Sequence, residues 1–281
     1  MEAARRAPPD TAEYGLDAPV AVRRLAFVAG GFGAVMVLGA LASSVVVMAV
    51  SFFVTFVGAL GFLSLVWSSR VGKIRARRRV VDSLVLVESD RVLDVGCGHG
   101  LLTIEAASRL IGGVAIGIDS WRATDPQTGV ATSSPTAVWD NAAIEGVDDR
   151  VEVTVGDALA LPFPDATFDA VVSALALHHL ADRDARTSAL LESTRVLRVG
   201  GRLTIVDSRF TAEYQTLLHE LGWSAQRSKR SWQMIPPVRT VSATRPSPSA
   251  IAPGARGTLR ATGARRRRRS RAAHPRRGGR S

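Results

Sequence analysis

The sequence predicts an α/β domain with a mostly parallel sheet, preceded by two transmembrane helices. Residues 91–119 alternate in pattern, with short apolar runs at 92–95 and 114–118 and helical apolar spacing over 101–110 between them. Strand–helix–strand alternation is typical of parallel sheets whose two faces are covered by helices. Residues 25–69 contain no charged residue and no histidine, which is the composition of membrane-spanning helices.

The uncharged run is long enough for two spans, because one span needs roughly 20 apolar residues. Ser43–Ser44 or Ser51 marks the expected turn between them. Basic residues flank both ends, at Arg23–Arg24 and from Arg70 to Arg79. Since cytoplasmic flanks carry an excess of Lys and Arg, we expect a hairpin in the plasma membrane with both ends, and the domain after it, on the cytoplasmic side. A signal peptide and a buried soluble hairpin are the alternatives.

The chain divides into four parts by composition. We expect a mobile N-terminal segment at 1–24, the hairpin at 25–69, the α/β domain at 70–246 and a disordered tail at 247–281. The tail holds 11 arginines and no acidic residue, which equals the net charge of +11 for the whole chain and leaves the rest neutral. We expect the tail to be incidental to catalysis, without a nucleic-acid partner. With one cysteine, the chain has no internal disulfide and no cysteine metal cluster.

Three glycines, Gly96, Gly98 and Gly100, follow the first strand and lead into a helix. Glycine permits positive φ and a close approach of the backbone to a ligand, and a helix N-terminus presents unpaired N–H groups. Asp94 lies in the strand before this turn. Asp119 ends the second strand, where an acidic side chain can accept hydrogen bonds from both ribose hydroxyls. The pattern predicts a nucleotide-like ligand.

The spacing D-x-G-x-G-x-G differs from the G-x-G-x-x-G of dinucleotide sites, which argues against a nicotinamide-dependent oxidoreductase. It resembles the first motif of the class I S-adenosylmethionine-dependent methyltransferases. The resemblance implies S-adenosylmethionine as the cofactor and a Rossmann-like, seven-stranded sheet with helices on both faces. The sheet ends in an antiparallel strand pair, which we expect at residues 223–234 and 238–243. It places Asp94 near the methionine ammonium, with Cys97 as a plain turn residue. Trp121, two residues beyond Asp119, is a candidate to lie against the adenine.

A second motif, Gly156-Asp157-Ala158, resembles the adenine-binding corner of the same family. There the acid accepts from the adenine amino group and the next backbone N–H binds a ring nitrogen, which implies these roles for Asp157 and Ala158. Residues 161–169, LPFPDATFD, resemble the branch that includes ubiquinone- and menaquinone-type methyltransferases. Ser173, which ends the expected fourth strand, is also counted as cofactor-binding. The resemblance covers about Ser83 to Pro246.

The residues after that strand bear on the acceptor. Residues 173–180 read SALALHHL and lack the proline-aromatic corner of base-methylating enzymes. His178 and His179 follow at the mouth of the expected site and are the candidate catalytic residues, because a histidine can act as a general base there. The sequence favours the other role for them, in which they shape the pocket and bond the backbone. No spacing suggests a metal. The sequence therefore favours a membrane-anchored methyltransferase acting on a small-molecule acceptor. The anchor raises the odds of a hydrophobic acceptor, but an anchor can also serve location alone. The alternative is a membrane-tethered, non-catalytic binding module whose basic tail contacts nucleic acid or anionic lipid.

The residues between the hairpin and the first strand mix arginine with apolar side chains. We expect residues 73–87 to form an amphipathic helix that packs on the domain, with arginines that can contact anionic headgroups.

Overall fold

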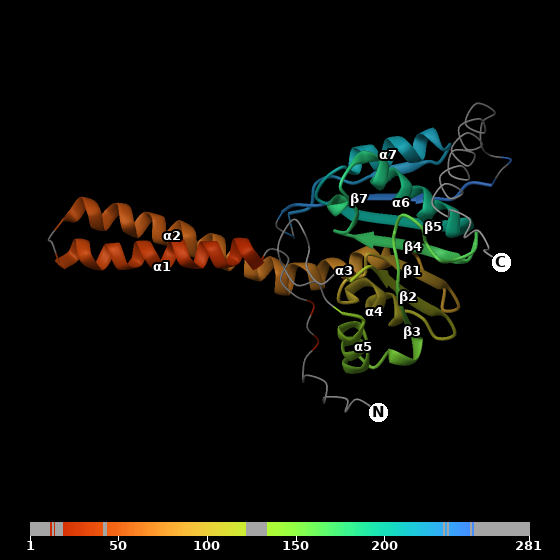
Figure 1. The fold of residues 1–281 in the computed structure, drawn as a ribbon, viewed down its shortest axis with the longest axis horizontal. Coiled ribbons are helices and arrows are strands. Elements are labelled where there is room, and N and C mark those ends of the chain that lie inside the picture. The colour runs from red at the N-terminus through yellow and green to blue at the C-terminus, as the bar shows by residue number, and fades with distance from the viewer. Residues whose placement is uncertain are drawn as a thin grey trace, which may run out of the picture.

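The computed structural model describes residues 12, 14, 19–41, 44–121, 134–232, 234, 236–247 and 249. It has an α/β domain from which two long helices project together (Figure 1). Of residues 1–24 the structure describes 12, 14 and 19–24, the last of which begin α1, and of residues 247–281 it describes 247 and 249. The expected mobility and disorder of the others lie outside the described residues and stay predictions, as do the domain boundaries.

The projecting helices are α1 (Pro19–Leu41) and α2 (Val45–Trp67), which pack against each other as a hairpin. The first begins earlier than expected, because Pro19 occupies a first-turn position where its missing N–H costs nothing. The chain turns just before α2, at Ser44. The alternative prediction of a turn at Ser51 was wrong. Ser51 lies inside α2 and is 2% exposed, so its side chain is packed against other residues.

Both helices are long and apolar enough to cross a bilayer, with mean hydropathies of 1.8 and 2.4 over Arg24–Leu41 and Val45–Trp67. Only 6% and 11% of these windows are buried. The core helix of a soluble protein buries its apolar side chains, so this exposure argues against a soluble buried hairpin.

The second helix continues without interruption into the domain. A short π-helix, η1 (Ser68–Gly72), joins α2 to α3 (Lys73–Asp82), so that one helical path runs from the apolar hairpin to the domain (Figure 1). The helix is shorter than the expected 73–87. It ends because Ser83 closes the last turn and Val85 adopts a φ of +47°, which an α-helix cannot include.

The sheet has seven strands in the order β3-β2-β1-β4-β5-β7-β6. The first five in this order pair in parallel, and β7 pairs antiparallel with both β5 and β6, which confirms the expected architecture. The strands are β1 (Arg91–Val95), β2 (Val114–Asp119), β3 (Val151–Val155), β4 (Phe168–Ala174), β5 (Leu197–Asp207), β6 (Ala225–Arg227) and β7 (Arg239–Thr244). A strand over residues 223–234 was expected, but β6 stops at Arg227 and the chain then leaves the sheet.

Helices cover both faces of the sheet (Figure 1). Successive strand residues point to opposite faces, so Val92 packs under α3, α4 and α5 while Leu93 packs under α6 and α7. The remaining helices are α4 (Leu101–Ala107), α5 (Pro135–Ile144), α6 (Arg183–Val196) and α7 (Thr211–Glu220), with single turns η2 (Asp148–Arg150) and η3 (Leu177–His179).

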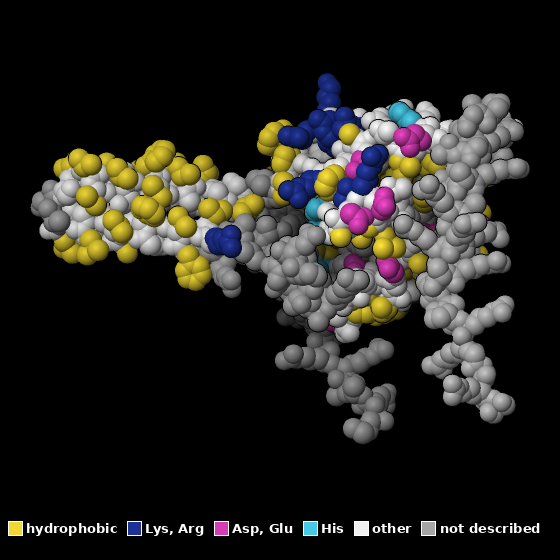
Figure 2. Space-filling view, turned by 45° about the horizontal axis from the view of Figure 1, so that its top comes forward, with side chains coloured by type: hydrophobic (Ala, Val, Ile, Leu, Met, Phe, Trp, Pro, Cys, Tyr) yellow, Lys and Arg dark blue, Asp and Glu magenta, His cyan; other side chains and the backbone are white. Residues whose placement is uncertain are grey.

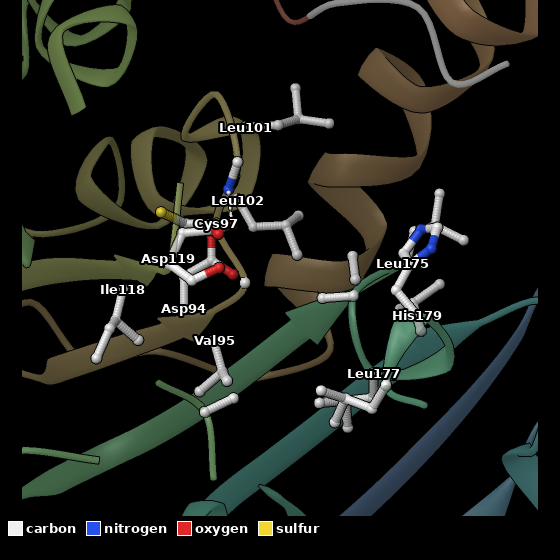
Figure 3. A pocket seen from close by; sticks show the side chains of 18 of the residues that line it. Asp94, Val95, Cys97, Leu101, Leu102, Ile118, Asp119, Leu175, Leu177 and His179 are labelled. Atoms are coloured by element: carbon white, nitrogen blue, oxygen red, sulfur yellow. Dashed lines mark hydrogen bonds between the residues drawn. The ribbon is translucent and has the colours of Figure 1, made fainter. Parts of the chain in front are cut away.

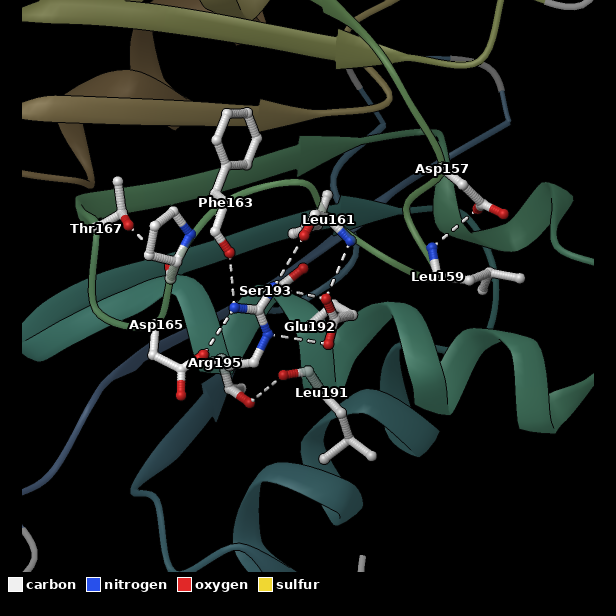
Figure 4. Close-up of polar contacts among 12 residues, drawn as sticks. Asp157, Leu159, Leu161, Phe163, Asp165, Thr167, Leu191, Glu192, Ser193 and Arg195 are labelled. Carbon is white, nitrogen blue, oxygen red and sulfur yellow. Dashed lines mark hydrogen bonds and ion pairs between the residues drawn. The ribbon is translucent and has the colours of Figure 1, made fainter. Parts of the chain in front are cut away.

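A buried ion pair fixes the segment between β3 and β4 (Figure 4). Arg195 Nη1 donates to the carbonyl of Phe163 at 2.7 Å and to Asp165 Oδ1 at 2.8 Å. Its Nη2 donates to the carbonyl of Leu161 at 3.0 Å and to Glu192 Oε2 at 2.7 Å. The Glu192 carboxylate, 3% exposed, also accepts from the Leu161 N–H at 3.0 Å. Asp157 lies near the start of this segment, so the ion pair helps to hold one edge of the expected site.

We expect Arg195→Met to lower the free energy of unfolding by about 3–5 kcal/mol, because it removes the cation that offsets the burial of Glu192. Chemical denaturation of the full chain in detergent measures this. Arg198→Met is the matched control: its ion pair with Asp169 has side chains 48% and 23% exposed, and an exposed pair contributes about 1 kcal/mol or less. Equal losses in the two variants would contradict the assignment.

Candidate functional site

The glycine-rich turn lies at the carboxyl end of β1 and is strained for any other residue. Gly96, Gly98 and Gly100 have φ values of +77°, +55° and +81°. A Cβ on Gly96 would lie 2.3 Å from the Ala176 Cβ, which forbids a side chain there. A Cβ on Gly98 would meet nothing within 4 Å and would instead occupy open space. The turn therefore leaves its backbone bare on the side of a cavity.

Asp119 is tied to this turn by its carboxylate. Its Oδ2 accepts from the Gly98 N–H at 3.0 Å, and its Oδ1 accepts from the Trp121 N–H at 3.1 Å. The indole N–H of Trp121 donates back to the Gly98 carbonyl at 3.0 Å. A carboxylate has about four acceptor positions, so Asp119 keeps the capacity to accept from a ligand. The structure thus brings together the second-strand acid, the turn and Trp121, as the sequence suggested.

Asp94 lies beneath the turn and is 2% exposed. Its Oδ2 accepts from the N–H and the hydroxyl of Thr103, at 3.0 and 2.8 Å. Burial raises the pKa of Asp94 to about 7, although these two hydrogen bonds act to lower it. A cationic group in the cavity would favour the charged form of this carboxyl. Burial also raises the pKa of the Cys97 thiol, which keeps that thiol neutral and fits a plain turn residue.

These residues open onto a cavity of about 720 Å³ (Figure 3). Acidic side chains and the glycine-rich turn form one side, at the carboxyl ends of β1, β2 and β3. The other side is apolar. Its side chains come from α3, from the segment after β4, from the segment after the glycine-rich turn and from the chain after β6. The apolar side includes Ala76, Val80, Leu101, Leu175, Leu177, Val206 and Met234.

The second expected motif also lines this cavity, through Asp157 and Ala158. Oδ1 of Asp157 accepts from the Leu159 N–H at 2.9 Å, which fixes the carboxylate at the bend after β3 (Figure 4). Asp157 and Asp119 therefore border one cavity although 37 residues separate them, because β2 and β3 are parallel neighbours.

Three expected cofactor residues, Gly100, Trp121 and Ser173, lie beside the cavity instead of lining it. The Ser173 hydroxyl donates to the Val95 carbonyl at 2.7 Å and is 2% exposed, so it ties β4 to β1. Gly100 starts α4 in the left-handed region and acts on the shape of the turn. The sequence predicted that Ser173 lies at the end of a strand. It could not predict that the side chain points to the neighbouring strand and not into the cavity.

The two histidines have different surroundings. Nδ1 of His178 lies 2.6 Å from Oδ1 of the fully buried Asp207, and the backbone N–H of His178 donates to Oδ2 of the same carboxylate at 3.1 Å. The hydroxyl of Tyr214 also donates to that Oδ2, at 3.2 Å. His179 lines the cavity (Figure 3), and its ring centroid lies 4.0 Å from that of His178. Asp207 thus orients one histidine, which packs on the one at the cavity.

Asp207 and Tyr214 were not expected from the sequence. The available signal was an acid at the carboxyl end of a buried parallel strand, the position that also identified Asp119. Among the described residues, no group of three or more His, Cys, Asp or Glu side chains is arranged to hold a metal ion.

A second cluster of buried charged side chains holds α3 in place at the side of the cavity. It was not expected from the sequence. Arg77 donates through Nη1 and Nη2 to Glu145 at 2.9 and 3.0 Å, and its Nε lies 2.8 Å from Glu105. Tyr14, from before the hairpin, also donates to Glu145 and lines the cavity. The residues before and after the hairpin therefore meet at the cavity.

Comparison with known proteins gives a family for this site. Residues 93–205 match the family model described as a methyltransferase domain. The chain is 36% identical over 136 residues to 27-O-demethylrifamycin SV methyltransferase of Amycolatopsis mediterranei, covering 47% of this chain and 44% of that protein. It is 35% identical over 134 residues to demethylmenaquinone methyltransferase of Thermus thermophilus, covering 48% and 54%. It thus spans about half the length of these two relatives.

A third relative aligns over most of its length. An uncharacterized methyltransferase of Mycobacterium tuberculosis is 32% identical over 185 residues, which cover 63% of this chain and 84% of that protein. Among solved structures, the [4+2]-cyclase SpnF superposes with a TM-score of 0.51 at 20% identity, over 62% of this chain and 80% of that one, which shows the fold alone. With the bare glycine-rich turn, the acid at the end of β2 and this relative, the chain belongs to the class I S-adenosylmethionine-dependent methyltransferases.

Proposed function

We propose that the protein is a membrane-anchored enzyme that methylates a small-molecule acceptor with S-adenosylmethionine. The observation that carries this proposal is the Asp119 carboxylate held on the bare turn at Gly98, beside a cavity of about 720 Å³. That volume lies within the range of roughly 300–1,000 Å³ usual for small-molecule sites. When bound, the cofactor supplies an electrophilic methyl group.

The residues present fit this cofactor. The open space at Gly98 admits a ligand against the backbone, and buried Asp94 supplies negative charge for the methionine ammonium. Asp119 accepts from the ribose hydroxyls, and Asp157 with Ala158 holds the adenine. Trp121 packs outside Asp119 and supports it. In this assignment the chain contributes mainly by positioning the reactants and by excluding water.

We expect Asp119→Ala to weaken S-adenosylmethionine binding tenfold or more, because charge-assisted hydrogen bonds contribute about 1.5–3 kcal/mol. Isothermal titration calorimetry measures the change. Asp149→Ala is the control, since Asp149 lies in η2, just before β3, its side chain is 74% exposed, and it does not line the cavity. Absence of binding by the unmodified chain would overturn the cofactor assignment.

We assign His179 as the group that accepts the acceptor's proton, with His178 and Asp207 as positioning residues. His179 lines the cavity, and His178, against which its ring packs, is anchored by the buried carboxylate. General-base catalysis contributes typically about 10²–10⁴-fold. We therefore expect His179→Ala to slow transfer of a tritiated methyl group to fractionated cell extract by about 10² or more, with cofactor affinity unchanged.

His219→Ala is the matched control for that loss. His219, on α7, bonds through Nε2 to the Ala225 carbonyl of β6 and is not among the residues that line the cavity. A His179→Ala variant with the rate of the unmodified chain would leave the histidine a structural role. Transfer into any fraction also separates an enzyme from a binding module that keeps the fold without turnover.

The anchor in this proposal is the α1–α2 hairpin, with both ends at the cytoplasmic face of the plasma membrane. The apolar window of α2 has 23 residues, about 35 Å at 1.5 Å per residue, and that of α1 has 18 residues, about 27 Å. Both fall within the roughly 17–25 residues used to span about 30 Å of hydrocarbon. A cysteine at Ser44, in the turn, should react with an impermeant reagent applied to intact cells. A cysteine at exposed Ser83, after α3, should not. Reaction at Ser83 would place the domain outside and overturn the topology.

A further inference from the structure

The end of the catalytic domain nearest the hairpin is basic and carries an exposed tryptophan. Figure 2 shows Lys and Arg side chains gathered on this end. We propose that it rests on anionic lipid headgroups and that the cavity behind it takes its acceptor from the bilayer. This docking face consists of the exposed residues Arg75, Arg78 and Arg79 of α3, and Lys229, Arg230 and Trp232 of the segment after β6. The acceptor part rests on the methyltransferase function proposed above.

The charge of the docking face has one sign. Residues 70–81 contain six basic residues and no acid, and residues 221–247 contain five basic residues and no acid. Lys and Arg near an anionic leaflet are attracted to it over about a Debye length. Trp232, 72% exposed, is the residue type that gathers at the level of lipid headgroups. Basic charge together with an exposed indole fits a membrane surface.

The length of the helical path between the hairpin and the domain places the docking face close to the lipid headgroups. The helical path α2–η1–α3 has no break, and Arg75 follows Trp67 by eight residues, about 12 Å along the axis. The headgroup zone adds roughly 5–7 Å beyond the hydrocarbon core on each side. Arg75 therefore lies within about one Debye length of the headgroups, and any tilt of the helix shortens that distance.

The same two elements form the apolar wall of the cavity. After β6 the chain folds back on itself, with hydrogen bonds of 2.8 and 3.1 Å between Ser231 and Val238. Between them Met234, 7% exposed, lines the cavity and belongs to a cluster with Ala76 and Val80 of α3. One side of each element is thus apolar and faces the cavity, and the other side is basic and exposed.

This arrangement separates the two halves of the cavity. Asp94 and Asp119 lie together at the strand ends, and Leu175, Leu177 and His179 lie across the cavity from them (Figure 3). The apolar half also includes Ala76, Val80 and Met234, which belong to the two elements that carry the docking face. An acceptor dissolved in the membrane can then reach the apolar half along α3 without passing through bulk water, where exposing its apolar surface costs roughly 25 cal/mol per Å². The substrate class that fits is an apolar, membrane-resident molecule with its nucleophilic end directed inward.

The test uses the full chain in nanodiscs, with Trp232→Cys carrying an environment-sensitive fluorophore. The native Cys97 is buried and its thiol pKa is raised, so it does not compete for the label. Ile111→Cys is the matched control: it is also 72% exposed, but it precedes β2, at the edge of the sheet opposite the cavity. We expect the emission of the label at 232, and not at 111, to shift to shorter wavelength in discs containing phosphatidylserine, compared with phosphatidylcholine alone.

The charge-reversal variant Arg75→Glu/Arg78→Glu/Arg79→Glu should lose that shift. It should also transfer at least tenfold less methyl into a lipid extract presented in anionic vesicles, with its affinity for S-adenosylmethionine unchanged by calorimetry. The affinity measurement shows that the variant has folded.

No shift at position 232 in either lipid overturns the docking, and so does a shift caused by added oligonucleotide but not by anionic lipid. Lipid-dependent shift with methyl transfer confined to water-soluble products overturns the acceptor class. Failure of the unmodified chain to bind S-adenosylmethionine instead overturns the proposed function, and the fluorescence then still decides the docking.

Discussion

The hydrogen bond from the Gly98 N–H to the Asp119 carboxylate is the contact on which the site depends. It joins the turn after β1 to the end of β2, and it exists because parallel strands deliver their carboxyl ends to one edge of the sheet. Because Gly98 has no side chain, the backbone of this turn can contact the Asp119 carboxylate and still be approached by a ligand. The cavity, the cofactor assignment and the position of the histidines all follow from that edge.

Much of this was available in the sequence because it depends on local pattern. The periodicity of residues 91–119, the acid at each strand end and the glycine spacing are short-range features, and they gave the parallel sheet and most of the polar half of the site. Ser173 shows the limit: a strand end was predicted, but which neighbour its hydroxyl meets depends on the pairing of β4 with β1. A side chain's direction at a strand end is a tertiary property.

The apolar half of the site was less accessible for the same reason. Met234 was expected at the end of a strand, and in the structure it lies beyond β6 and packs on α3. Asp207 and Tyr214 become meaningful only once the turn at Leu177–His179 is placed against the end of β5. Tyr14 and Arg77, which meet at the cavity, are 63 residues apart and separated by the hairpin. Long-range contacts of this kind carry no local signature.

The meeting of Tyr14 with Arg77 has a mechanical consequence. The chain leaves the domain near Tyr14 and returns at Arg77, and the two side chains share the carboxylate of Glu145. The hairpin is therefore joined to the domain on both sides, through Tyr14 before α1 and through Arg77 after α2. Two attachments restrict its rotation relative to the domain more than one would. A domain held in this way samples few orientations relative to the hairpin. In the proposed membrane-anchored enzyme, the entropy of orienting the domain on the membrane is then largely lost when the chain folds, and not each time the domain meets the membrane surface. Loss of the Tyr14 contact would leave the hairpin joined to the domain through α3 alone, while Asp94, Asp119 and Asp157 would keep their places at the strand ends.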